Sequence, residues 1–159
     1  MTYSLFRSLI VAMSLFMPLV SASYAVAEPV RKDAMVVEAP WARASIGTSR
    51  PSAAYLTIHN EGTSGDVLIG IQTSVAGKAD VHTMTMTDGV ARMGVAGAVE
   101  IPAGNKVELK PGGMHIMLMK LAQPLEKGKS FSMTLRFEKA GNITLTVPVL
   151  GIGATGPGE

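Results

Sequence analysis

The stretch SFSMTLRFE, residues 130–138, decides the fold class of this chain. Its apolar side chains, Phe131, Met133, Leu135 and Phe137, alternate with polar ones. Side chains two residues apart share one face of an extended segment, so this alternation is typical of a β-strand with one face in a core. The stretch therefore predicts a half-buried strand. Because no segment sustains a helical period for long, we expect little helix.

Short apolar segments of the same kind recur along the chain and are separated by turn-forming residues such as Asp88-Gly89. Regular short strands with such turns predict an all-β antiparallel sandwich or small barrel with Greek-key connections. We expect Pro148 to stop the last strand or to confine it to a sheet edge. The other expected strands are residues 35–38, 53–59, 67–72, 80–86, 90–93, 98–101, 106–109, 114–120 and 142–147.

The beginning of the chain has the pattern of a secretory signal. Arg7 is the only charged residue among the first 27, an apolar run covers residues 9–20, and Ala25-Val26-Ala27 supplies a cleavage pattern. This pattern predicts cleavage before Glu28. A transmembrane helix is the competing interpretation of the apolar run, but the run is too short to span a membrane. The predicted organisation is a signal peptide at 1–27, one domain at 28–149 and a flexible, glycine-rich tail at 150–159.

The charge of the mature chain argues against several partner classes. Removing Arg7 from 14 basic residues leaves 13 against 12 acidic ones, and they are dispersed along the sequence. Nucleic-acid binding needs a clustered basic face, so it is not expected. With no later segment long and apolar enough to span a bilayer, we expect no stable membrane insertion after cleavage. The expectation is a soluble monomer of a bacterial periplasm.

The side chains that could bind a metal ion are the most informative feature of the sequence for function. The chain has no cysteine, which excludes disulfides and thiolate metal sites. Instead, His82 is followed after ten residues by Met93, after twenty-one more by His115, and then by Met117. A thioether is a neutral, polarizable ligand that selects Cu(I), while imidazole serves several transition metals. Two imidazoles with two thioethers therefore predict a Cu(I) site.

Strand geometry is compatible with convergence of the four donors. In the expected strand at 114–120, His115 and Met117 project to one face, roughly 7 Å apart at their α-carbons. The hairpin signal Asp88-Gly89 folds Met93 back beside His82. A single methionine of this kind is more often packing than ligand, so the prediction depends on all four donors together.

Two stretches resemble a known family. HTMTMTDGVARM (residues 82–93) and ELKPGGMHIMLM (residues 108–119) are similar to the periplasmic copper chaperones called PCu(A)C, and the family signature H-x10-M-x21-H-x-M is matched at every spacing. The resemblance also includes APWAR (39–43), AYL (54–56), PL (124–125) and MTLRF (133–137), so it covers nearly the whole predicted domain.

The resemblance implies a cupredoxin-like β fold in which His82, Met93, His115 and Met117 hold Cu(I) at an exposed end. It also implies delivery of copper toward the CuA centre of cytochrome c oxidase, with a thioredoxin-like protein of the Sco type as a further candidate partner. Two departures stand out. Met114 replaces a residue that is often aromatic in the family, and the tail has no His or Met, which predicts one copper per chain.

Other functions fit the residues less well. A blue-copper redox site requires a cysteine thiolate, and no nucleophile elbow or paired carboxylates indicate an enzyme. Copper storage or homeostasis stays an alternative to transfer, and a purely structural β domain would leave the spacing to coincidence. Secondary assignments are a core position for Trp41, a strand-bracing role for Arg43, a rim position for His59, and an apolar collar or secondary copper docking site for Met84, Met86 and Met119.

Overall fold

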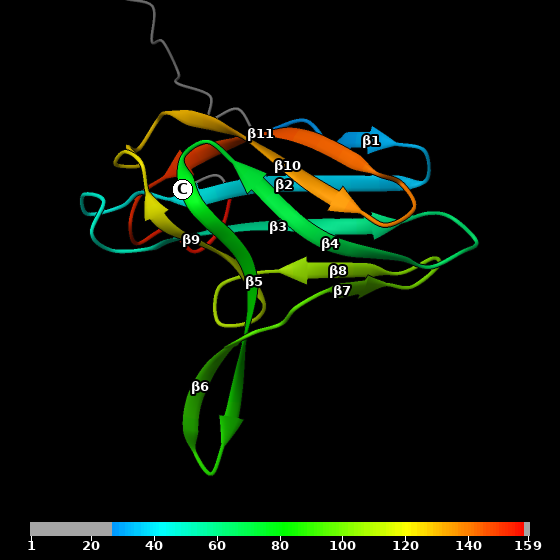
Figure 1. Cartoon of the computed structure of the whole chain (residues 1–159), viewed down its shortest axis with the longest axis horizontal. Helices are drawn as coiled ribbons and strands as arrows, with labels where there is room; N and C mark the ends of the chain where they lie inside the picture. Colours follow the sequence, from blue (N-terminus) through cyan, green and yellow to red (C-terminus); the bar gives the residue numbers. More distant parts are fainter. Residues whose placement is uncertain (1–26, 158–159) are drawn as a thin grey trace, which may run out of the picture.

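A computed structural model describes residues 27–157. The predicted signal peptide thus lies outside the described residues, except for Ala27. The fold is an open β-sandwich (Figure 1). Its strands are β1 (Val30–Lys32), β2 (Met35–Arg43), β3 (Ser52–Asn60), β4 (Asp66–Thr73), β5 (Ala76–Thr87), β6 (Val90–Val95), β7 (Val99–Ile101), β8 (Lys106–Leu109), β9 (His115–Leu121), β10 (Ser130–Phe137) and β11 (Asn142–Leu150).

Two sheets form the layers. The larger sheet has the order β6-β5-β9-β3-β2, with β1 beside β2 and β8 beside β3, and the smaller sheet has the order β11-β10-β4-β7. β11 joins them, because it pairs antiparallel with β10 and then parallel with β2 at Val149 and Leu150. The predicted all-β fold class is confirmed. No helix that could cross a membrane occurs between residues 27 and 157.

The core fills the space between the sheets and follows the predicted alternation. In β10 the buried side chains are Phe131, Met133, Leu135 and Phe137, as expected from the sequence. Val81, Ile116 and Leu118 from the larger sheet point into the same core. Because neighbouring residues of a strand point to opposite faces, the residues between them lie on the outer face of the larger sheet.

Two prolines stand inside strands that were expected to be shorter. β11 does not stop before Pro148; this proline is the last residue paired with β10, opposite Ser130, and the next residue already pairs with β2. Its missing N–H therefore falls where the strand changes partner. β2 likewise continues past Pro40 through a bulge between Glu38 and Trp41, where Ala39 has a φ of +46°.

A buried carboxylate fixes the start of β4. Asp66 is 6% exposed, and its Oδ1 accepts hydrogen bonds from the backbone N–H groups of Val67 and Lys139, at 2.7 and 2.9 Å. Its Oδ2 accepts a third from Ala140 at 2.9 Å. Burial alone would raise the pKa of Asp66, but the three N–H donors and the Lys139 charge outweigh it and leave the pKa below its ordinary value.

Part of the predicted tail lies against the larger sheet. Ala154 is buried beside Trp41 and Tyr55, whose rings are 4.3 Å apart, so Trp41 has the buried position expected of it. Arg43 lies over the Tyr55 ring and donates a hydrogen bond from Nε to the Ala154 carbonyl at 3.0 Å. Arg43 thus braces the strand end, and the predicted flexible segment is anchored at Ala154.

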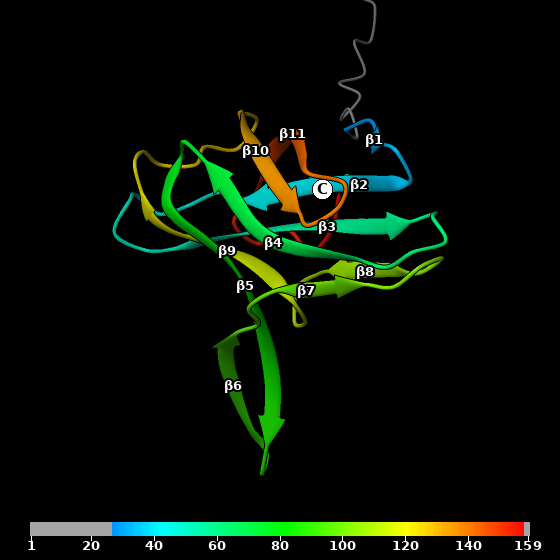
Figure 2. The same ribbon diagram turned by 45° about the vertical axis from the view of Figure 1, so that its right-hand side comes forward.

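The β5–β6 hairpin extends away from the sandwich as a separate arm (Figures 1 and 2). Every residue of β6 is exposed. The turn is the predicted Asp88-Gly89 pair, and both residues have a positive φ, at +52° and +76°, which is the conformation that a tight hairpin turn requires. The arm begins level with His115, the first residue of β9, because His82 pairs with His115 on β9 and with Val95 on β6.

Candidate metal site

Strand register brings the predicted donors onto one face. His82 on β5 lies directly opposite His115 on β9, with ring centroids 6.2 Å apart. Met117 follows two residues along β9 and lies opposite Asp80. Met93 on β6 lies opposite Met84, two residue pairs further along the hairpin than His82. All four predicted residues therefore lie on the outer face of the larger sheet, around the base of the hairpin.

His115 has a defined tautomer. Its side chain is 6% exposed, and its Nδ1 is 2.9 Å from the carbonyl oxygen of Gly113. A carbonyl can only accept, so Nδ1 carries the proton and Nε2 keeps its lone pair. The turn before β9 supplies this acceptor, and Gly112 at φ +78° permits the sharp bend. A backbone acceptor of this kind is the usual support for a histidine that binds a metal through its other nitrogen.

His82 has no such support. Both of its ring nitrogens are buried, and neither has a hydrogen-bond partner. A neutral imidazole has one N–H donor and one acceptor, and leaving such a buried group unpaired costs about 1–3 kcal/mol. A cation held between His82 and His115 would use the free lone pair. The donor set thus fits a metal ion better than it fits a packed core.

The remaining donors are soft ones. Within residues 27–157 no group of three or more His, Cys, Asp or Glu side chains is arranged to hold a metal ion. Asp80 stands beside His82 on the same face, but its Oδ2 is 2.6 Å from Lys78 Nζ, which balances its charge. The thioethers of Met93 and Met117 are neutral. The face therefore offers two imidazoles and two thioethers with no net charge of their own, a combination suited to Cu(I).

The other methionines and the third histidine differ in their position relative to the four proposed donors. Met84 and Met86 share the face of His82 and are 37% and 68% exposed, while Met119 lies opposite Lys78 at the far end of the site. His59 is distant in the sheet, between Val36 and Lys106 on the neighbouring strands, and its Nδ1 is 3.8 Å from Glu61 Oε1. Its predicted rim position fits this surrounding.

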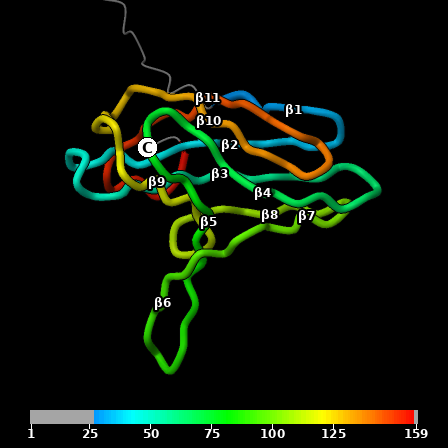
Figure 3. Tube along the Cα trace, viewed as in Figure 1, coloured from blue at the N-terminus to red at the C-terminus, as the bar shows by residue number. Residues whose placement is uncertain are grey.

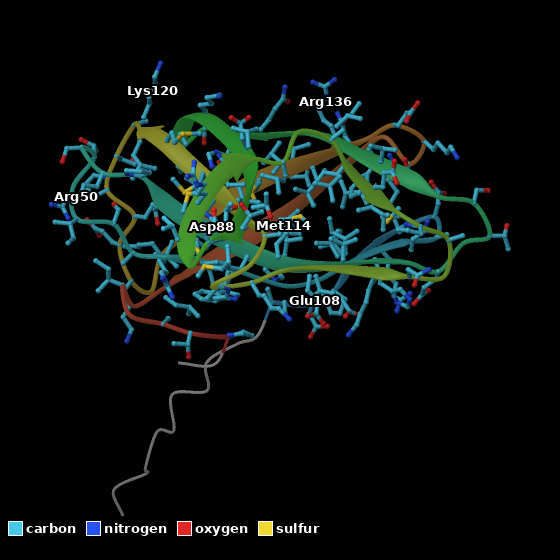
Figure 4. All side chains as sticks on the ribbon, turned by 90° about the horizontal axis from the view of Figure 1, so that it is seen from below. Arg50, Asp88, Glu108, Met114, Lys120 and Arg136 are labelled. Carbon is cyan, nitrogen blue, oxygen red and sulfur yellow. The ribbon has the colours of Figure 1, made fainter. Side chains whose placement is uncertain are left out.

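Met114 packs against the core instead of joining the metal face. In Figure 4, which looks along the hairpin from below, Met114 and the turn residue Asp88 are close only in projection, because Figures 1 and 2 show the turn far from the sandwich. Arg50 and Glu108 are at the periphery of the same view. The residue next to His115 that differs from the resembling family thus contributes to packing below the site.

Sequence reasoning missed the surroundings of Met117. This side chain lines a pocket of about 260 Å³ together with the exposed Ile46 and Ile152 and with Arg43 and Arg50. No local pattern could reveal this pocket, because it is assembled from the 44–51 loop and the chain after β11. Asp80 could have been found, since it lies two residues before His82 and hence on the same strand face.

Comparison with known proteins gives a consistent relationship. The family described as "Putative lipoprotein LpqE-like" matches residues 35–149. One relative, "Putative lipoprotein Lxx21020" of Leifsonia xyli subsp. xyli, is 36% identical over 118 residues, which are 74% of this chain and 70% of the relative. The family region contains β2 to β10 and therefore all four donors of the outer face.

Solved structures share the architecture. The apo PCuAC domain from PmoF1 is 28% identical with a TM-score of 0.66, over 78% of this chain and 99% of that domain. The copper-bound PCuAC domain from PmoF2 is 25% identical with a TM-score of 0.66, over 78% and 98%. The solution structure of CuI-DR1885 from Deinococcus radiodurans is 29% identical with a TM-score of 0.57, over 79% and 81%. The expected cupredoxin-like sandwich is thereby confirmed, and the chain belongs to the LpqE-like family, with the fold of PCuAC domains.

Proposed function

We propose that this chain is a copper chaperone that binds one Cu(I) and passes it to an acceptor protein by ligand exchange. His82, Met93, His115 and Met117 are the proposed ligands. The observation that carries the proposal is His82, whose two buried and unpartnered ring nitrogens face His115 on a surface that continues into thioethers. The copper-bound PmoF2 domain and CuI-DR1885, which share the fold, support copper as the ion.

The exposure of the proposed ligands suits transfer. His115 is 6% exposed and Met93 is 50% exposed, so the site has a buried anchor and an accessible side. An incoming donor from an acceptor can displace the Met93 thioether first, while the histidines still hold the ion. Copper stays in the +1 state, and no proton or electron moves. No enzymatic step is required.

The compartment and the acceptor extend the same proposal. The signal-like start of the sequence and the lipoprotein names of the family and its relative support an exported, periplasmic protein. Resemblance to PCu(A)C chaperones supports delivery toward the CuA centre of cytochrome c oxidase, either directly or with a Sco-type protein. Retention of copper in the presence of such acceptors would instead indicate storage.

The first test is a titration. The purified chain from Glu28 onward should compete with a coloured Cu(I) chelator and retain one equivalent, with no visible colour of its own because Cu(I) has a filled d shell. The measurement is the absorbance of the chelator complex under anaerobic conditions. If the chain withdraws no copper from the chelator, the proposed function is wrong.

A second test addresses the thioether ligands. Met93→Leu and Met117→Leu should each weaken Cu(I) binding by at least about tenfold, or 1.4 kcal/mol, because leucine keeps the volume but lacks the sulfur. Unfolding of the copper-free variants should stay close to wild type. Met119→Leu is the matched control and should bind normally. Unchanged affinity in Met93→Leu or Met117→Leu would show that the ligand assignment is incorrect.

A further inference from the structure

We propose that the β5–β6 hairpin carries a second, weaker Cu(I) site made of three thioethers, Met84, Met86 and Met93. Copper would pass through this site between the histidine pair and an external donor or acceptor. The inference rests on the proposed function, because Met93 belongs to both sites. It adds a route for the ion, which the four ligands alone do not provide.

Register brings the three sulfurs within reach of one ion. Met84 and Met93 are directly opposite on β5 and β6, and such pairs have β-carbons about 4.5–5.5 Å apart. Met86 follows two residues along β5 on the same face. Methionine has three flexible side-chain torsions, so the three thioethers can converge without a change in the backbone.

Exposure argues against a packing role. Met84, Met93 and Met86 are 37%, 50% and 68% exposed, whereas His115 beside them is 6% exposed. The thioethers thus become more accessible with distance from the histidine pair. The opposite face of the hairpin carries a different set of side chains, Thr83, Thr85, Thr87, Val90, Arg92 and Gly94, with no sulfur among them. The methionines are confined to the face that continues from His82.

The chemistry of the step is simple ligand exchange. The sulfur of Met84 donates a lone pair to Cu(I) while one imidazole nitrogen leaves with its own lone pair. Copper remains +1, no proton is transferred and the total charge is unchanged. A set of thioethers without imidazole should bind Cu(I) more weakly. Cu(I) therefore occupies the histidine site most of the time and the hairpin site only transiently. Because the arm stands clear of the sandwich, a partner can reach the sulfurs there (Figure 2).

The site can be tested by nuclear magnetic resonance of the methionine methyl groups in the chain from Glu28 onward, titrated anaerobically with Cu(I). The first equivalent should shift the methyl signals of Met93 and Met117, and further equivalents should shift those of Met84 and Met86 and shift the Met93 signal again, because Met93 belongs to both sites. Unmoved Met84 and Met86 signals at excess Cu(I) would overturn the second site. If the first equivalent left the methyl signals of both Met93 and Met117 unchanged, the proposed function itself would fail, which is a different result.

The route is tested by kinetics. Met84→Leu/Met86→Leu should bind the first equivalent with an affinity within about threefold of wild type, and should release it to excess chelator about tenfold more slowly, a barrier change of about 1.4 kcal/mol. Met119→Leu, on the same face beyond the site, should release copper at the wild-type rate. A wild-type rate in the double variant would overturn the proposed route, and so would equal slowing in Met119→Leu.

Discussion

Replacing His82 with leucine should stabilise the copper-free chain and at the same time remove tight Cu(I) binding. The two buried ring nitrogens lack partners, so their removal should raise the free energy of unfolding by about 1–2 kcal/mol. Affinity for Cu(I) should fall by at least about 100-fold, since even groups that merely support a ligand contribute 10–100-fold. Urea unfolding of the copper-free protein and chelator competition measure the two effects.

Substitutions of the two other histidines serve as controls for this result. His115→Leu should also remove Cu(I) binding, but it loses the hydrogen bond to Gly113 and should lower the stability of the copper-free chain by about 1 kcal/mol. His59 lies away from the site, so His59→Leu should change the free energy of unfolding by no more than about 0.5 kcal/mol. If His82→Leu unfolds more easily than wild type, the unpartnered nitrogens do not describe the protein in solution.

Replacing Asp66 with asparagine should lower the free energy of unfolding at neutral pH by about 3 kcal/mol, because a charged acceptor of three backbone N–H groups is lost. The amide nitrogen of the asparagine would also face a backbone N–H, so two donors would meet. Copper affinity should be unchanged, since Asp66 is remote from the outer face. Chemical unfolding of the two proteins at equal ionic strength gives the difference.

The effect of Asp66 has a defined pH dependence. Its pKa in the folded chain lies below the ordinary value of 3.8, so the carboxylate stabilises the fold above that value, and this contribution is lost as the pH falls through the folded pKa. The difference in the free energy of unfolding between wild type and Asp66→Asn should therefore be largest at neutral pH. It should disappear as the pH falls below about 4. Glu100→Gln, an exposed change on β7, should show no comparable gap. A gap that is constant across this range would contradict the role of the charge.

Much of the fold was predictable because strands with one buried face carry a period of two. The alternation in residues 130–138 and the Asp88-Gly89 turn both correspond to observed elements, β10 and the β5–β6 turn. The lengths of β2 and β11 were not predictable from local rules. Prolines normally end strands, but Pro40 follows a bulge and Pro148 stands at a change of strand partner, and both situations depend on tertiary pairing.

The candidate site could be predicted from the sequence to about the same extent as the fold. Spacing and strand parity selected His82, Met93, His115 and Met117, and register places them on one face. Sequence could not show that both nitrogens of His82 are covered, that His115 is fixed by Gly113, or that the hairpin stands apart from the sandwich. Burial and long-range contacts decide these properties, and neither is encoded within a short window of sequence.

The parallel pairing of β2 with β11 has a consequence for how this chain folds. It joins Ala42 to Val149, so the two sheets are connected by segments more than one hundred residues apart in the sequence (Figure 3). Contacts of such long sequence separation slow folding. Domains dominated by them fold in about milliseconds to seconds. During synthesis this pairing cannot form before β11 has left the ribosome. Until then Ala42 and Arg43 lack their partners on β11, while antiparallel pairs such as β2–β3 and β5–β6 can already form.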